Sequence, residues 1–453
     1  TTLQTEAGRW TKAGAMALKA RILQFAASPL FNDSQGYYGG TSEAEQKRLV
    51  WYGEYKPEYW TRFKEACKAF IDKLSTDGGY SLVQAVGTRP QDYRLAYRTA
   101  YFDEGSSEII HSVHWLNKPN TQYVWYTWMG HNRTVYSVTQ EYVEMFPWSD
   151  GTPFDWDKAE TEGKLNQMFI KGDSVEGKVQ LQNVLLTRDP RLYETAIVNG
   201  TPSTLDWTTA AMTGNPYETW VGGSTSKNNS VDEQNGFATS YRNMKYSFGE
   251  YSGHGLQWAT IRLSDVYLMY AEALIQTNTS GNFKDAIEWI DKVRERVGMK
   301  GLVECNPDKD LLHNKELLMQ ELLRERACEL GFENARYMDM VRYKMKSTFE
   351  KPLHGIRIYR MVKNPTTGKF ERCNLPWYNA GKGQTFTCSD GTKVKVAYKD
   401  GIQQPTVFDY EKFELSKAKR QWWTQGFDPK WYLTPFKTTE INKGYGLVQN
   451  PGW

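Results

Sequence analysis

Glu325 and Glu329 are the acidic pair whose spacing most resembles a catalytic arrangement. Residues four apart share a helix face, and paired carboxylates are the groups that glycoside hydrolases use. Arginines accompany both carboxylates, however, and nearby positive charge lowers a carboxylate pKa, whereas a general acid needs a raised one. We therefore interpret this charged run as an ion-pair lattice that holds two helices together. Its members are Arg324, Glu325, Arg326, Glu329, Glu333, Arg336, Asp339 and Arg342.

The stretch from residue 114 to residue 133 has the residue types of a carbohydrate-binding surface. Four aromatic rings fall within residues 122–128, and in an extended chain they alternate between the two faces. Sugars place flat C–H patches on aromatic rings, while amides and guanidinium groups satisfy their hydroxyls. The alternative, that these rings form part of a core, stays open. The candidate ligand-binding residues here are Trp115, Asn117, Asn120, Tyr123, Trp125, Tyr126, Trp128, His131 and Arg133.

A second candidate is the tyrosine pair Tyr37 and Tyr38, which lies in a glycine-rich loop. The C-terminal tryptophans are interpreted instead as rings that pack against helices. These are Trp422, Trp423 and Trp431.

Signals for metals and nucleophiles are weak. No H-E-x-x-H, P-loop or G-x-S-x-G motif occurs, so we expect no metal site and no cofactor. Three neighbouring aspartates lack an EF-hand pattern and do not favour calcium: Asp150, Asp155 and Asp157. Cys67 and Cys328 lie in helical patterns, where buried thiols are expected. A disulfide between Cys373 and Cys388 stays open, because sequence cannot show whether their hairpins are neighbours.

The size and charge of the chain exclude some classes of protein. Its 453 residues allow one large domain or two to three average ones, and can bury a core. The net charge of +3 is below the strongly basic range of a nucleic-acid binder. No run of 18 apolar residues occurs, so no membrane-spanning helix is predicted.

The elements that must position these residues are mainly helical. Apolar residues at helical spacing predict a helix over 9–31, which should end at Ser28 because Pro29 follows. A partner helix is predicted over 57–74. Residues 258–345 carry the same periodicity and predict two helix pairs, with Gly298 at a helix C-terminus.

The remaining segments are less regular. Residues 80–257 predict short strands, turns and polar loops, and a long irregular region inside a compact protein is usually functional or mobile. Residues 351–420 predict strands, with a hairpin at Asp390-Gly391 between Phe386 and Val394.

Several blocks, in order along the chain, resemble the SusD/RagB family. They are GRWTK at 8–12 with AASPLFN at 26–32, TQEYVEMF at 139–146 with Asp150-Gly151, RDPRLY at 188–193, LRERACELGFE at 323–333, YLTPF at 432–436, EINK at 440–443, and QNPGW at 449–453.

This resemblance implies a mainly α, SusD-like fold in one domain over 1–453. Tetratricopeptide-like helix pairs at about 9–75 and 258–345 would form the scaffold. An irregular ligand-side region would follow at about 80–257, a hairpin-containing region at about 351–420, and a C-terminal segment at 421–453.

The resemblance also implies a function. Members of the family are surface lipoproteins of the outer membrane of Bacteroidetes that bind nutrients, usually glycans, without catalysis. The implied partner is a SusC-like TonB-dependent transporter. In the family a longer N-terminal part carries the lipid-bearing cysteine, so we expect that part and its lipid anchor to be absent from this chain. Two alternatives stay open: a glycoside hydrolase with an all-helical core, and a protein-interaction scaffold without glycan affinity.

Overall fold

The structure is a computed structural model that describes residues 8–115, 137–175, 178–203, 210–212, 214–225, 239–246, 256–416 and 420–453. Within these ranges, no helix is both long and apolar enough to cross a membrane. The helices are α2 (Lys12–Ala27), α3 (Glu43–Gln46), α4 (Glu58–Asp77), α5 (Pro90–Phe102), α7 (Gln140–Met145), α8 (Trp156–Thr161), α9 (Leu192–Thr195), α10 (Leu263–Gln276), α11 (Lys284–Glu295), α12 (Leu302–Cys305), α13 (Lys315–Glu329), α14 (Ala335–Arg342), α15 (Lys346–Glu350), α16 (Gln421–Gln425) and α17 (Thr438–Ile441), with the short 3₁₀ turns η3 (Leu165–Gln167), η6 (Tyr398–Asp400) and η7 (Pro429–Tyr432).

The strands form small antiparallel sheets. β11, β7 and β8 make a three-stranded sheet, and four further pairs are β1 with β6, β2 with β3, β4 with β5, and β9 with β10. Their bounds are β1 (Ile109–Trp115), β2 (Ile170–Val175), β3 (Lys178–Leu186), β4 (Ala196–Ile197), β5 (Arg242–Asn243), β6 (Leu256–Arg262), β7 (His354–Lys363), β8 (Phe370–Cys373), β9 (Thr385–Thr387), β10 (Lys393–Lys395) and β11 (Phe408–Glu414).

The two predicted N-terminal helices are present as α2 and α4. The Thr11 hydroxyl caps α2 by accepting a bond from the Gly14 amide, and Ser28 is extended, so the helix ends where Pro29 requires. α4 ends at Gly78, whose φ of 66° suits a residue without a side chain. Both helices share a buried core with α10 that includes Phe63, Phe70 and Met269.

The predicted helix pairs of residues 258–345 are α10 with α11 and α13 with α14. Leu268, Ile290 and Leu322 lie in the core between α10, α11 and α13, and Gly298 has the left-handed φ of 76° expected after α11. The helical block begins later than predicted, however. Residues 256–262 form β6, whose Trp258 lies opposite Val113 of β1.

The prediction that residues 80–257 are irregular, with short strands and turns, was wrong at α5 and at the shorter helices α7 and α8. The helix α5 has 13 residues and starts at Pro90, which suits a first turn. Its apolar periodicity is broken by Arg94 and Arg98, both of which are buried and paired with Glu194 of α9. Because these charged residues point inward, the hydrophobic pattern of the sequence hides the helix.

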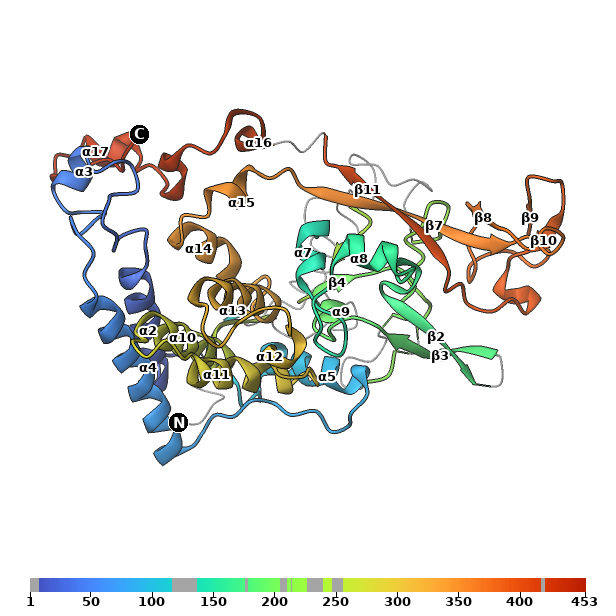
Figure 1. The fold of residues 1–453 in the computed structure, drawn as a ribbon, viewed down its shortest axis with the longest axis horizontal. Coiled ribbons are helices and arrows are strands. Elements are labelled where there is room, and N and C mark those ends of the chain that lie inside the picture. The colour runs from blue at the N-terminus through green and yellow to red at the C-terminus, as the bar shows by residue number, and fades with distance from the viewer. Residues whose placement is uncertain are drawn as a thin grey trace.

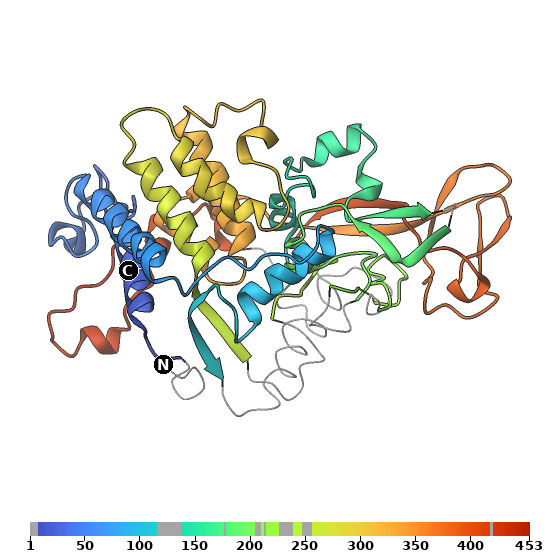
Figure 2. The ribbon, with the colours of Figure 1, turned by 90° about the horizontal axis from the view of Figure 1, so that it is seen from below.

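The strand prediction for residues 351–420 is confirmed. The turn at Asp390-Gly391 joins β9 to β10, and Phe386 pairs with Val394 as predicted. Figure 1 shows β7 and β11 as a long ribbon running from the helical end of the molecule to the hairpins of β8, β9 and β10 at the opposite end. In Figure 2, β1 and β6 lie side by side beneath the helices.

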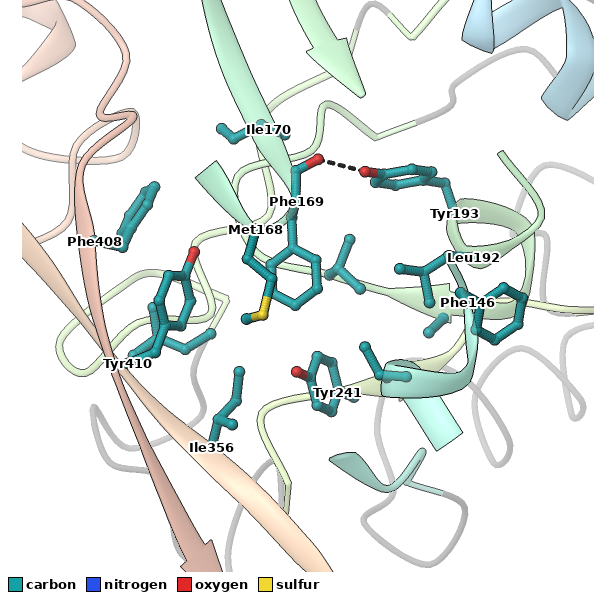
Figure 3. Close-up of a cluster of buried hydrophobic side chains, with 14 of the residues drawn as sticks. Phe146, Met168, Phe169, Ile170, Leu192, Tyr193, Tyr241, Ile356, Phe408 and Tyr410 are labelled. Atoms are coloured by element: carbon teal, nitrogen blue, oxygen red, sulfur yellow. Dashed lines mark hydrogen bonds between the residues drawn. The ribbon is translucent and has the colours of Figure 1, made fainter. Parts of the chain in front are cut away.

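One large core lies where this ribbon meets the middle of the chain (Figure 3). Ile356 of β7 and Phe408 and Tyr410 of β11 pack with Phe169 and Tyr241, which come from distant segments. The Tyr193 hydroxyl donates to the Phe169 carbonyl, so even the polar atom of this buried ring is satisfied. The β ribbon and the central loops are therefore one packed unit.

Candidate ligand-binding surface

Most of the predicted ligand-binding stretch lies outside the described residues. These are Asn117, Asn120, Tyr123, Trp125, Tyr126, Trp128, His131 and Arg133. Trp115 is the last residue of β1, where its backbone pairs with Leu256 of β6. The described chain resumes at Ser137, and the carbonyl of Val138 accepts a bond from the Thr239 hydroxyl. The described residues on either side of the stretch are thus the end of a strand, at Trp115, and a buried, hydrogen-bonded position, at Val138.

An exposed tryptophan from the segment before α2 packs on the β1–β6 sheet. The Trp10 ring stacks on His111 with centroids 3.7 Å apart and an interplanar angle of 10°, while Trp10 keeps 51% of its surface exposed. Burial lowers the pKa of His111, which favours the neutral ring. An exposed indole held flat against a neutral ring has the form of a stacking surface for a ligand.

Tyr37 and Tyr38 occupy different environments. Tyr37 is only 7% exposed and lies edge-on to Tyr432, in a cluster formed by the glycine-rich loop and the C-terminal segment. That burial leaves little of its ring for a ligand. Tyr38 is 36% exposed and keeps a free edge at the surface. Trp422 and Trp431 pack together in the same cluster, as predicted.

The structure also assembles an aromatic surface that the sequence analysis missed. Tyr378 and Tyr398 stack with centroids 5.0 Å apart and an interplanar angle of 23°, and Tyr398 is 44% exposed. The buried Trp377 supports the pair, lying edge-on to Tyr398 with a centroid distance of 5.2 Å. We call these three residues the tyrosine ledge. Twenty residues separate its two tyrosines, so no local spacing reveals it.

Glu218 holds the tyrosine ledge in place through hydrogen bonds to its backbone. This fully buried carboxylate accepts hydrogen bonds from the backbone amides of Trp377, at 2.9 Å, and Tyr378, at 2.5 Å. Its other oxygen accepts from the Ser224 amide at 2.9 Å. Ser224 in turn accepts a 2.9 Å bond from the exposed side chain of Asn379. A rigid ring pair with an amide at its edge suits the flat faces and hydroxyls of a sugar.

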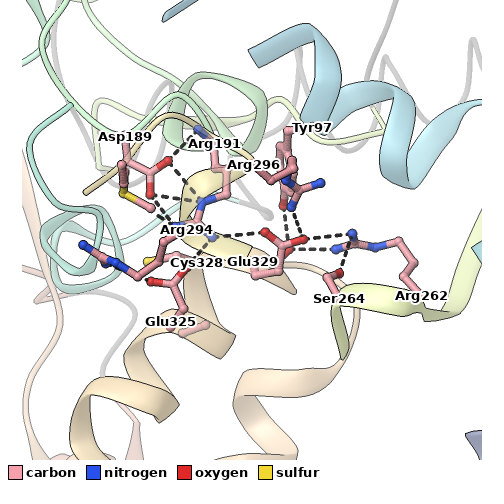
Figure 4. Close-up of polar contacts among 12 residues, drawn as sticks. Tyr97, Asp189, Arg191, Arg262, Ser264, Arg294, Arg296, Glu325, Cys328 and Glu329 are labelled. Atoms are coloured by element: carbon pink, nitrogen blue, oxygen red, sulfur yellow. Dashed lines mark hydrogen bonds and ion pairs between the residues drawn. The ribbon is translucent and has the colours of Figure 1, made fainter. Parts of the chain in front are cut away.

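The predicted ion-pair lattice is present, and it is larger than two helices (Figure 4). Glu329 of α13 accepts from Arg191 at 3.0 Å and Arg262 at 2.9 Å, while Glu325 accepts from Arg191 at 2.6 Å. Arg191 and Arg262 come from the middle of the chain and from β6, so the lattice joins segments far apart in sequence. All of these side chains are buried.

The charges in this lattice balance. Five basic groups face five carboxylates, and each carboxylate contacts at least one basic group. The basic groups are Arg191, Lys245, Arg262, Arg294 and Arg296, and the acidic ones are Glu108, Asp189, Glu325, Glu329 and Glu333. Buried charges are tolerated only when they are paired in this way.

The electrostatics of the lattice do not suit a general acid. Burial by itself would raise the pKa of Glu329, but the surrounding guanidinium groups, led by Arg296, hold that pKa well below its usual range. Arg191 and Arg294 likewise lower the pKa of Glu325 against the effect of burial. Burial does raise the pKa of Glu108, yet this carboxylate is fully enclosed, so no substrate can reach it. The structural interpretation of Glu325 and Glu329 is confirmed.

A second lattice links α2 to α10, α13 and α14. Asp265 accepts from Arg326 at 3.0 Å and pairs with Arg21, and Asp339 accepts from Arg326 and Arg342 at 2.8 Å each. A cavity of about 230 Å³ with both charged and apolar walls opens beside it, lined in part by Arg21, Arg326 and the exposed Met338. Its charged lining residues are engaged in ion pairs, so it belongs to the scaffold.

Among the described residues, we find no arrangement that would bind a metal or form a disulfide. No cluster of three or more histidine, cysteine, aspartate or glutamate side chains is placed to hold a metal there. Asp155 instead caps α8 by accepting from the Lys158 amide. All five cysteines are buried and free, so the disulfide considered between Cys373 and Cys388 is not formed.

The sequence model of the SusD family matches residues 95–453, most of the chain. The chain belongs to the SusD family. A curated SusD-like protein of Bacteroides ovatus is 29% identical over 110 residues, which cover 23% of this chain and 18% of that protein. The aligned part is thus under a fifth of the length of that SusD relative.

Solved structures agree on the SusD-like fold. A SusD-like protein from Bacteroides fragilis aligns with a TM-score of 0.57 and 19% identity, over 99% of this chain and 66% of that one. The protein BT4246 aligns with a TM-score of 0.63 and 19% identity, over 100% of this chain and 73% of that one. The predicted fold, mainly α and SusD-like with short β hairpins, is confirmed.

Proposed function

We propose that this SusD-family protein binds a glycan at the cell surface, without catalysis, and delivers it to a SusC-like TonB-dependent transporter. The family membership over residues 95–453 is the observation that carries this proposal. The buried, charge-balanced lattices support it, because they make the helical part a rigid scaffold and leave its carboxylates occupied. Ligand contacts then fall to the loops and hairpins.

Two surfaces are proposed to hold the glycan. The first is the aromatic stretch of residues 115–133, which follows strand β1 in the chain. The second is the tyrosine ledge. Fully covering an aromatic side chain contributes about 1.5–3 kcal/mol, and a partly covered ring less. After the cost of association, two or three rings give a dissociation constant from about millimolar to micromolar, which suits a protein that must release its ligand.

The family membership supports a proposal for the partner and the location. We propose that the protein works as a lipid-anchored protein on the outer membrane of a Bacteroidetes cell, with its helical side against the transporter barrel. Exposed side chains on that side, such as Ile22 of α2 and Tyr337 of α14, offer apolar contact area. Co-purification of the partner with the wild-type protein, but not with an Ile22→Asp, Tyr337→Asp variant, tests this contact.

A glycan array followed by titration calorimetry tests the main proposal. Binding of an oligo- or polysaccharide with no new reducing ends after long incubation is the expected result. Release of reducing ends would establish a glycoside hydrolase instead. No affinity for any glycan, together with retained partner binding, would establish an interaction scaffold.

A further inference from the structure

Positive charge is concentrated at one end of the molecule. Residues 363–400, from the end of β7 to η6, hold seven basic and three acidic side chains and so carry a net charge of +4. The whole chain carries +3, so the remaining residues together carry −1. We call residues 363–400 the basic arm. Figure 1 shows its β8, β9 and β10 at the end of the molecule opposite α2 and α4.

The carboxylates of the basic arm accept hydrogen bonds from backbone amides and form no ion pair with its lysines among the described residues. Glu371 accepts from the Ser389 amide at 2.7 Å, and Asp390 accepts from the Thr392 amide at 2.9 Å. Asp400 accepts from the Gly383 amide at 2.9 Å.

Among the basic side chains of the arm, only Arg372 forms an ion pair within the described structure. Its partners are Asp409 and Glu411 of β11. The other six are exposed lysines with no ion pair to any residue that the structure describes. They are Lys363, Lys369, Lys382, Lys393, Lys395 and Lys399.

The β9–β10 hairpin places two of these lysines on the same face of one strand. Lys393 and Lys395 alternate with Val394, so they share the outer face, about 7 Å apart along the strand. Their cross-strand partners are Thr387 and Thr385, whose hydroxyls lie on the same face. The inner residues Val394 and Phe386 pack against a small buried cluster and hold this orientation.

We propose that the basic arm binds the acidic groups of a polyanionic glycan, either uronate carboxylates or sulfate esters. This inference rests on the proposed glycan-binding function and narrows its ligand class. Unpaired ammonium groups beside hydroxyl donors suit repeated anionic oxygens, and the tyrosine ledge on the same arm adds a stacking face beside Lys399. The outer face of the hairpin presents threonine hydroxyls rather than apolar side chains, so it fits a hydrated polymer better than a lipid surface.

Calorimetry with three probes tests this inference: polygalacturonate, chondroitin sulfate and neutral dextran. We expect at least one acidic polymer to bind, with an affinity that falls as salt is raised, because exposed charges are screened. The Lys393→Glu, Lys395→Glu variant should lose about tenfold in affinity, since each reversed charge costs roughly 0.5–1 kcal/mol. The matched control, Lys12→Glu, Lys19→Glu, reverses two exposed lysines on the distant α2 and should bind as the wild type does.

Four results would overturn the inference. Binding of neutral glycans but of neither acidic polymer would reject the acidic ligand and leave the proposed function standing, whereas no binding of any glycan would reject both. An equal loss in the control variant would show a nonspecific charge effect. Binding to vesicles of phosphatidylglycerol, without binding to either acidic polymer, would make the arm a membrane contact. Unchanged circular dichroism would show that both variants remain folded.

Discussion

Arg191 and Glu329 form a buried ion pair of 3.0 Å although 138 residues separate them in the sequence. The same guanidinium nitrogen also donates to Glu325, one turn earlier on α13. Arg191 lies just before α9, whose Glu194 pairs with Arg94 and Arg98 of α5. The contact therefore ties the central loops of the SusD-like fold to its helical scaffold.

Replacing Glu329 by glutamine should destabilise the fold strongly. The change keeps the shape of the side chain but leaves buried arginines without their counter-charge, and breaking a buried pair typically costs about 3–5 kcal/mol. The free energy of unfolding, from urea denaturation followed by circular dichroism, is the measurement. Glu440→Gln is the control, because Glu440 is exposed and its pair with Lys443 is worth about 0–1 kcal/mol. A loss below about 1 kcal/mol at Glu329 would contradict this role.

The lattices should also make the fold sensitive to acid. The pKa values of Glu325, Glu329, Asp265 and Asp339 all lie below their ordinary values in the folded protein. Such groups stabilise the fold fully above their unfolded pKa of about 4, and this contribution is lost as the pH falls through the folded pKa. Urea midpoints should therefore stay level between about pH 7 and 5 and drop below about pH 4. A level midpoint down to about pH 3 would show that the pairs contribute little.

The native protein should resist thiol reagents. All five cysteines are buried and free, and burial raises the pKa of Cys67 and Cys328, which disfavours the reactive thiolate. Ellman's reagent should detect almost no thiol in the native protein and five after denaturation without reductant. Finding three would mean that one disulfide exists, with Cys373 and Cys388 the first pair to test.

The aromatic stretch should carry glycan affinity rather than stability. We expect the Trp125→Ala, Trp128→Ala variant to weaken binding by about tenfold, because two rings lose their contact with the sugar. Its melting temperature should change little. Trp453→Ala is the matched control, since this tryptophan is 45% exposed in the C-terminal tail. A large fall in melting temperature would instead identify the two rings as core.

The tyrosine ledge can be tested separately. Tyr398→Ala removes the exposed ring and should reduce glycan affinity severalfold, with a stability loss of about 0.5–1.5 kcal/mol from the lost ring contacts. Tyr445→Ala removes an exposed tyrosine from the C-terminal segment, outside both the ledge and the basic arm, and should leave affinity unchanged. Equal affinities for wild type and Tyr398→Ala would exclude the ledge from the binding surface.

The sequence predicted those helices and turns that are determined by residues close together in the chain. The periodicity of α10 and α11, the end of α2 at Ser28 and the turn at Asp390-Gly391 each depend on residues within a few positions of one another. The same logic failed at α5, because Arg94 and Arg98 are buried there and interrupt the apolar stripe. From sequence alone, a charged residue is expected to be exposed, because the partner that would allow its burial cannot be seen.

For this protein, the sequence by itself determined the helices α2, α4, α10, α11, α13 and α14, the end of α2, the Asp390-Gly391 hairpin and the structural role of the Glu325–Glu329 pair. The tertiary structure decided which arginines neutralise those carboxylates, that Tyr37 lies in a core, and that Tyr378 and Tyr398 meet. Among the described residues, it also left the lysines of the basic arm without carboxylate partners. The physical reason is distance along the chain: helix spacing and turns are set by neighbours, whereas charge pairing and ring stacking join residues that only folding brings together.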